Sequence, residues 1–313
     1  MSPLGAVSIG GSLVAASRTI RAHICELYHS ADLQQIVLCP GQLVALIHIF
    51  HAMRLRSILM SNEEYYTSGH FPGMEVSKCE SDEIAKIAHR DTPDVVLMSR
   101  VSWKGQPLPV RREFLQIRTR PNRPLLICDY AHAGAVGFPT FRAQAADIIC
   151  GDLHKWVFPE DHMAQLAFVW SSTRNLQKEI NSIFSGYYLA GNKHLARAAR
   201  WISPYDLLSA AKWLRSSDST RSSLRKSYRR NLAVAMEIVE SLRLVQPARS
   251  CILWLSPDES IPRKHEIDCL QSRGDVQIWK TGEGCRIMCS GMIKRALTYR
   301  GPNLRTAGRI RRS

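Results

Sequence analysis

The sequence lacks any long apolar run. No stretch of its 313 residues approaches the roughly 20 apolar residues that a membrane-spanning helix needs. The apolar opening from Leu4 to Ala16 is interrupted by glycines and serines and has no basic residue before it. It therefore does not resemble a secretory signal peptide. We expect a cytoplasmic protein that has no membrane partner.

Paired cysteine motifs are also missing. The nine cysteines are an odd number, and only Cys285 and Cys289 lie close together. This pattern excludes a disulfide framework and a zinc site built from two cysteine pairs. His48 and His51 share a predicted helix face but lack a third ligand, so we predict no metal site. Most cysteines lie beside Ile, Leu or Val, and we expect reduced cysteines that act as small core residues.

Acidic residues are scarce: 27 Asp and Glu stand against 42 Lys and Arg, and the formal net charge is +15. Nearly half of that charge lies between Lys294 and the end of the chain, where there is no acidic residue. A nucleic-acid-binding module would show a recognisable motif or aromatic residues within such a patch, and only Tyr299 is aromatic here. A second basic run, Arg215 to Arg230, carries apolar residues at helical spacing. We therefore do not expect nucleic acid as a partner.

With 45% apolar and 22% charged residues, the composition is typical of a globular protein. Short apolar runs alternate with helical patterns over the first 170 residues. Because these runs are apolar on both faces, they predict a mostly parallel sheet covered by helices on both sides, which is an α/β fold. The candidate strands are Ile36–Cys39, Ser57–Met60, Val95–Ser99, Leu125–Cys128, Asp147–Cys150 and Leu166–Trp170.

The pattern changes after Ser171. Long helical stretches follow, and then short strands are predicted at Cys251–Leu255, Val276–Trp279 and Arg286–Cys289. This change predicts a second, smaller α+β unit. We expect a large α/β domain at residues 1–215, a small domain at 216–293 and a basic tail at 294–313.

Two polar segments follow neighbouring strands, at the edge where such sheets bind ligands. Asp129 follows Leu125–Cys128, and Lys155 follows Asp147–Cys150. A buried acid needs a positive partner, and a desolvated lysine suits imine chemistry. Pyridoxal phosphate requires both groups: a lysine for the Schiff base and an acid that keeps the pyridine nitrogen protonated.

The motif Asp129-Tyr130-Ala131-His132-Ala133 and the motif His154-Lys155-Trp156 resemble the class V aminotransferases, which are fold type I pyridoxal-phosphate enzymes. Cysteine desulfurases, kynureninases and isopenicillin N epimerase-like enzymes belong to that group. The resemblance implies a three-layer large domain of the fold type I kind. It also implies a homodimer whose active sites are shared between subunits, with an amino acid as the substrate.

The same resemblance implies roles for the residues of the two motifs. Lys155 would hold pyridoxal 5'-phosphate and act as the catalytic lysine. Asp129 would bind the pyridine nitrogen of the cofactor. His132 would contact the cofactor and take part in proton transfer, and His154 would lie beside the lysine.

Further positions match the family in order along the chain. Gly41 and Gln42 open a predicted helix and look like the phosphate loop, and the backbone N–H groups of a helix N-terminus bind phosphate well. Ser203 resembles the residue that reaches the phosphate from the partner subunit. Arg286 resembles the arginine that binds the substrate carboxylate through two parallel hydrogen bonds.

An aromatic or histidine side chain that stacks on the cofactor ring is expected between residues 64 and 72. Tyr65, Tyr66 and His70 are the candidates, and the sequence does not choose among them.

Asp152 departs from the family, which often has Ser or Thr at this position. A carboxylate near a phosphate repels it unless a positive group intervenes. Either Asp152 points elsewhere, for example toward His154, or phosphate binding is altered. A cysteine desulfurase is disfavoured, because Cys285 adjoins Arg286 and Cys269 lies in a predicted helix.

These observations predict a pyridoxal-phosphate-dependent transferase or lyase that acts at Cα or Cβ of an amino acid. The reaction would be transamination, elimination or substitution, or epimerisation, in specialised biosynthesis. One alternative is a protein like the group II decarboxylases, which also carry Asp-x-Ala-x-x-Gly and His-Lys-Trp. Another is a decayed, non-catalytic relative that serves as a binding protein.

Overall fold

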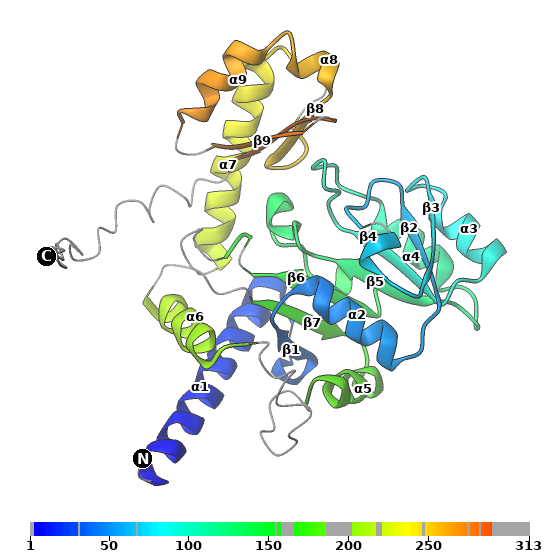
Figure 1. The fold of residues 1–313 in the computed structure, drawn as a ribbon, viewed down its shortest axis with the longest axis vertical. Coiled ribbons are helices and arrows are strands. Elements are labelled where there is room, and N and C mark those ends of the chain that lie inside the picture. The colour runs from blue at the N-terminus through cyan, green and yellow to red at the C-terminus, as the bar shows by residue number, and fades with distance from the viewer. Residues whose placement is uncertain are drawn as a thin grey trace, which may run out of the picture.

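The structure is a computed structural model. It describes residues 3–30, 32–66, 68–153, 155–157, 166–185, 202–216, 221–245, 248–273, 276–281 and 283–289. His154 and the basic tail at 294–313, both named in the predictions above, lie outside the described residues. Two sheets organise the described part of the chain (Figure 1): one of seven strands and one of three.

The large sheet has the strand order β1-β7-β6-β5-β4-β2-β3. β7 runs antiparallel to both of its neighbours, and the other strand pairs are parallel. The prediction of a mostly parallel sheet is confirmed. Its strands are β1 (Ile36–Cys39), β2 (Ser57–Ser61), β3 (Glu75–Cys79), β4 (Val95–Ser99), β5 (Leu125–Asp129), β6 (Ile148–Asp152) and β7 (Ala167–Ser171).

Helices cover both faces of this sheet, so the large unit has three layers. Alternate strand residues enter different cores, as Cys128 and Ile127 show. One core is closed by α2 (Gln42–Ala52) and α5 (Arg174–Ser185), and the other by α1 (Pro3–Tyr28), α3 (Ile84–Asp91) and α4 (Val110–Ile117). Single-turn 3-10 helices complete the unit: η1 (Leu33–Gln35), η2 (Ser68–His70), η3 (Ala133–Val136) and η4 (Phe141–Gln144).

The sequence patterns did not predict α1, α4 or β3. In α1, the buried residues Ile20, Ile24 and Leu27 recur at helical spacing and form one apolar stripe, while the glycine-rich start of the helix obscured the pattern. β3 lies at the sheet edge and is largely exposed, so its polar sequence lacks the apolar run that identified the central strands. None of the described helices combines the length and apolar character that a bilayer crossing requires.

The smaller sheet is antiparallel, with the order β8-β10-β9. Its strands are β8 (Ile252–Leu255), β9 (Val276–Thr281) and β10 (Gly284–Cys289), and its helices are α7 (Arg221–Ser241), α8 (Pro257–Ser260) and α9 (Lys264–Gln271). The α6 helix (Pro204–Ser216) precedes them and packs against α1. Figure 1 shows α7 running from the small sheet toward the large one. The domain limits at 215 and 293 stay predictions.

Backbone and side-chain hydrogen bonds join the two sheets. The N–H of Cys251 donates to the carbonyl of Ala135 at 3.0 Å. The hydroxyl of Ser250, which is buried, donates to the carbonyl of Gly105 at 2.7 Å. Both contacts place the start of β8 against segments that follow β4 and β5 of the large sheet. The small sheet is therefore held near the carboxyl edge of the large one.

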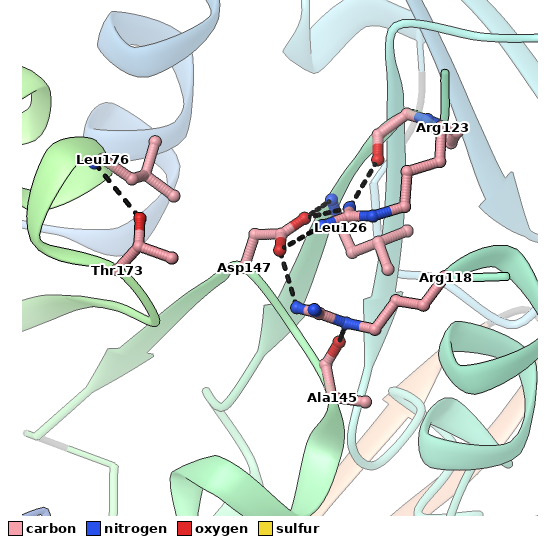
Figure 2. A network of polar contacts seen from close by, with 8 residues as sticks. Arg118, Arg123, Leu126, Ala145, Asp147, Thr173 and Leu176 are labelled. Atoms are coloured by element: carbon pink, nitrogen blue, oxygen red, sulfur yellow. Dashed lines mark hydrogen bonds and ion pairs between the residues drawn. The ribbon is translucent and has the colours of Figure 1, made fainter. Parts of the chain in front are cut away.

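A buried carboxylate holds the amino ends of the central strands, opposite their carboxyl ends (Figure 2). Asp147, just before β6, accepts hydrogen bonds from the guanidinium groups of Arg118 at 2.6 Å and Arg123 at 2.8 Å. It also accepts the N–H of Leu126 at 3.0 Å. Because a buried charge is tolerated only with such partners, this network fixes where β5 and β6 begin. The predicted site lies at the other ends of these two strands.

Candidate active site

The ends of β5 and β6 bring the two predicted motifs together. These strands are parallel neighbours, and Asp129 pairs with Cys150 in their register. Asp129 is the last residue of β5, and Asp152 is the last residue of β6. Lys155 follows three residues later. The prediction that an acid and a lysine stand at adjacent strand ends describes the structure correctly.

Asp129 is a buried acid with defined donors. Its side chain is 5% exposed. The hydroxyl of Tyr66 donates to Oδ2 at 2.8 Å, and the N–H of Ala131 donates to Oδ1 at 2.6 Å. Burial raises the pKa of Asp129, while the positive charge of Lys155 and these donors oppose the rise. The cation and the donors favour the ionised carboxylate, and burial favours the protonated form.

Lys155 remains reachable from solvent. Its side chain is 34% exposed, and Nζ lies 3.1 Å from Oδ2 of Asp152. The next residue, Trp156, is buried and donates its indole N–H to the carbonyl of Ala131 at 3.0 Å. A Cβ at Gly134 would lie 2.4 Å from Trp156, so only glycine allows this close packing. The indole therefore ties the lysine segment to the end of β5.

The N-terminus of α2 meets the same cluster. The N–H of Gln42 donates to Oδ1 of Asp152 at 3.2 Å. Gly41, the residue before the helix, caps it without a side chain. The buried amide of Gln42 lies close enough to Asp129 to help lower the pKa of that carboxyl, yet neither amide atom completes a hydrogen bond of regular geometry. Gln42 therefore lies between the two acids at the strand ends.

A cation from the small sheet also reaches the site. Arg286 on β10 places Nη2 at 3.1 Å from Nε2 of His132. The His132 ring stands nearly perpendicular to that of Trp156, with centroids 6.2 Å apart. Trp254 and Trp279 flank Arg286 in the register of the small sheet. The Arg286 guanidinium carbon lies 5.7 Å from the Trp279 ring centroid, a cation–π contact.

The charge of Arg286 is not neutralised by any carboxylate in the described part of the chain. Burial lowers the pKa of its guanidinium, and no acidic group opposes that effect. Its Nε is buried without a hydrogen-bond partner. Since arginine stays charged in proteins, this half-buried group can accept an anion such as a carboxylate.

Comparison with solved structures decides the fold. Alanine–glyoxylate aminotransferase from Nostoc sp. superposes with a TM-score of 0.66 at 13% identity, covering 92% of this chain and 88% of that protein. Ureidoglycine–glyoxylate aminotransferase from Bacillus subtilis gives 0.62 at 12% identity, covering 90% and 81%. Histidinol-phosphate aminotransferase from Sinorhizobium meliloti, solved with pyridoxal 5'-phosphate, gives 0.61 at 12% identity, covering 92% and 83%.

This chain has the fold of the fold type I pyridoxal-phosphate enzymes. No protein-family profile matches the sequence, and no curated protein matches it. The fold predicted from the sequence is confirmed.

Within the fold type I scaffold, the three ring candidates differ in position. Tyr66 is buried and bonds Asp129. Tyr65 is 66% exposed. His70 is half-buried, with its ring centroid 5.3 Å from that of Tyr65 and 6.0 Å from that of Tyr66. The structure thus brings Tyr66 to the acid, while a stacking role for Tyr65 or His70 stays a prediction.

Ser203 makes a helix-capping contact within its own chain. Its hydroxyl accepts the N–H of Tyr205 at 3.1 Å, just where α6 begins at Pro204. This is the usual contact of a helix-capping serine. A role for Ser203 toward a neighbouring subunit stays a prediction.

Sequence reasoning missed Glu64. Its carboxyl is buried and accepts both the N–H of Ser99, at 2.5 Å, and the Ser99 hydroxyl. Burial, helped by the charge of the nearby Asp129, raises the pKa of Glu64 to about 8, although the hydrogen bonds from Ser99 oppose the rise. Ser99 ends β4 and pairs with Asp129. The signal was available, since Glu64 is an acid shortly after a buried strand, as Asp129 is.

Proposed function

We propose that this protein is a pyridoxal-phosphate-dependent enzyme that acts at Cα or Cβ of an amino acid. One observation carries the proposal. Asp129 and Lys155 stand on adjacent strand ends, close enough for the lysine charge to lower the pKa of the acid. This is the pair that the cofactor needs for its ring nitrogen and its aldehyde.

The residues of the site fit the ring and aldehyde ends of that cofactor. Asp129 is buried and ready to pair with a cation, and Lys155 is reachable. Near the expected phosphate, α2 offers a helix N-terminus and the buried amide of Gln42, which completes no hydrogen bond of regular geometry. The fit at that end depends on Asp152, which already takes the Gln42 N–H.

When bound, the cofactor supplies an electron sink for the bond that breaks at Cα. Lys155 would hold the cofactor through Nζ, and its amine would accept or return a proton at Cα of the substrate. The Asp129 carboxyl would face the pyridine nitrogen and favour its protonated form. Tyr66 and Ala131 donate to the two Asp129 oxygens, orient the carboxyl and favour its ionised form.

The substrate end is served by Arg286 and His132. Arg286 binds the substrate carboxylate, which completes the pairing that its half-buried charge lacks. His132 Nε2 contacts Nη2 of the guanidinium and orients it. His132 is also the second candidate for moving the Cα proton.

We further propose the class V aminotransferase type, a cytoplasmic location and a role in specialised biosynthesis. The motifs around Asp129 and Lys155 support the class. The candidate reactions are transamination, elimination or substitution, and epimerisation. No feature of the described site favours the decarboxylase-like alternative.

The homodimer is likewise a proposal. Exposed apolar side chains lie on two helices that pack together: Val14 on α1, and Tyr205 and Leu208 on α6. Exposed apolar groups of this kind support an interface between copies. Sedimentation equilibrium tests it, and a monomer at micromolar concentration would remove the proposal.

The test of function is spectroscopic. The purified protein should be yellow, and borohydride should fix the cofactor to the peptide that contains Lys155. Lys155→Ala should abolish both results, while Lys86→Ala, an exposed lysine on α3, should leave them unchanged. A protein that stays colourless with added cofactor would reject the proposal.

A screen of amino acids and their D-isomers then identifies the reaction class through changes in the visible spectrum. Release of carbon dioxide would favour the decarboxylase-like alternative. Salt-dependent nucleic-acid binding without cofactor binding would favour the binding-protein alternative.

A further inference from the structure

The N-terminus of α2 already holds an anion that belongs to the chain. The helix N-terminus attracts negative charge through its N–H groups and its dipole. Its first N–H, that of Gln42, donates to Oδ1 of Asp152 at 3.2 Å. Asp152 is only 8% exposed. A carboxylate thus stands at the position where the proposed function expects the cofactor phosphate.

This carboxylate is held from two sides. Oδ1 receives the Gln42 N–H, while Oδ2 lies 3.1 Å from Lys155 Nζ. Asp152 therefore bridges the helix N-terminus and the lysine.

The Gln42 side chain is an independent sign of a ligand. It is 3% exposed, and its amide lies near Asp129 without completing a hydrogen bond of regular geometry. An oxygen-bearing ligand beside α2 would complete the hydrogen bonds of this amide, while Asp152 takes the backbone donor.

We propose that Asp152 competes with the phosphate of the cofactor for the N-terminus of α2. The inference rests on the proposed function. Two anions cannot share one N–H donor without repulsion, so a phosphate gains little at this helix unless Asp152 moves away. The chain consequently binds pyridoxal, which has the same ring and aldehyde but no phosphate, about as well as pyridoxal phosphate.

The experiment compares both vitamers by absorbance titration and borohydride trapping. We expect the wild-type affinities for the two vitamers to agree within about tenfold. Asp152→Asn keeps the shape of the side chain but removes its charge. It should strengthen pyridoxal phosphate binding by about tenfold or more, which corresponds to about 1.4 kcal/mol of electrostatic interaction. Pyridoxal binding should change little. Asp152→Ser is a second variant if the first does not fold.

Asp268→Asn is the matched control. Asp268 is exposed on α9 and pairs with Lys280, away from α2. Asp268→Asn changes the net charge by the same amount as Asp152→Asn. A gain in affinity for pyridoxal phosphate in Asp268→Asn as well would therefore overturn the role of Asp152. A wild-type preference for pyridoxal phosphate of about a thousandfold, which is roughly 4 kcal/mol, would also overturn it.

Inorganic phosphate separates this inference from the proposed function. Thermal unfolding in phosphate should show no specific stabilisation of the wild type and a clear rise in Tm for Asp152→Asn, whether or not a cofactor binds. No rise in Asp152→Asn overturns the inference. Failure of both vitamers to attach to Lys155 in every variant rejects the proposed function instead.

Discussion

Arg286 and His132 lie 154 positions apart in the sequence, and their side chains meet at 3.1 Å. A guanidinium N–H can only donate, so Nε2 of His132 must accept. The contact therefore selects the His132 tautomer that carries its hydrogen on Nδ1. It also points the Arg286 guanidinium from the small sheet toward the carboxyl edge of the large sheet, where Asp129 and Lys155 lie.

Arg286→Ala should raise KM for the amino-acid substrate by roughly 10- to 100-fold, because a charged hydrogen bond contributes about 1.5–3 kcal/mol. The matched measurement uses the amine that lacks the carboxylate of the same substrate, for which the variant and the wild type should behave alike. Steady-state kinetics with both compounds checks the role. Equal losses for the acid and the amine would contradict carboxylate binding by Arg286.

Tyr66→Phe removes the hydroxyl that donates to Asp129. Since that donor lowers the pKa of Asp129, its loss should raise this pKa further. Asp129 would then take up its proton at a higher pH, so the pH below which the visible spectrum and activity change should move upward. Tyr65→Phe is the control, because Tyr65 is exposed. An identical pH profile for Tyr66→Phe and the wild type would refute the effect.

Glu64→Gln should alter how stability depends on pH. The pKa of Glu64 rises from 4.5 to about 8 in the folded state, so between these values the folded chain holds a proton that the unfolded chain has lost. Stability contributed by Glu64 therefore falls as pH rises through this window, by at most about 1.4 kcal/mol per pH unit.

Urea unfolding of the wild type and Glu64→Gln at pH 6.5 to 8.5 tests this slope. That range avoids most of the opposite effect of His23, whose pKa is lowered to about 4 by burial. The difference in unfolding free energy should shift in favour of Glu64→Gln as the pH rises. Glu75→Gln, at an exposed position on β3, should show no such trend.

Asp147→Ala should lower the free energy of unfolding and should not act on the catalytic step. It removes the acid that pairs with Arg118 and Arg123 (Figure 2), and loss of one partner of a buried ion pair typically costs about 3–5 kcal/mol. Thermal or urea unfolding measures the loss. Asp91→Ala, which breaks an exposed ion pair with Arg90, should unfold like the wild type. A small effect at Asp147 would contradict its anchoring role.

Local sequence patterns were enough to predict the central strands and the two motifs at their ends. A strand buried on both faces has consecutive apolar residues, and β4, β5 and β6 show such a run directly in the sequence, up to their polar last residues. Because the carboxyl ends of neighbouring parallel strands share one edge, Asp129 and Lys155 could be placed together without coordinates. The same logic fails for β3, whose edge position leaves it polar.

The sequence by itself determined the α/β layering, the ends of the central strands and the placement of an acid and a lysine at neighbouring strand ends, because periodicity and strand ends are local properties. Only the tertiary structure decided which tyrosine reaches Asp129, that Glu64 is buried against Ser99 and that Asp152 lies at the start of α2. These contacts depend on strand order and on the path of each loop. No spacing along the chain encodes them, since the partners come from different strands and helices.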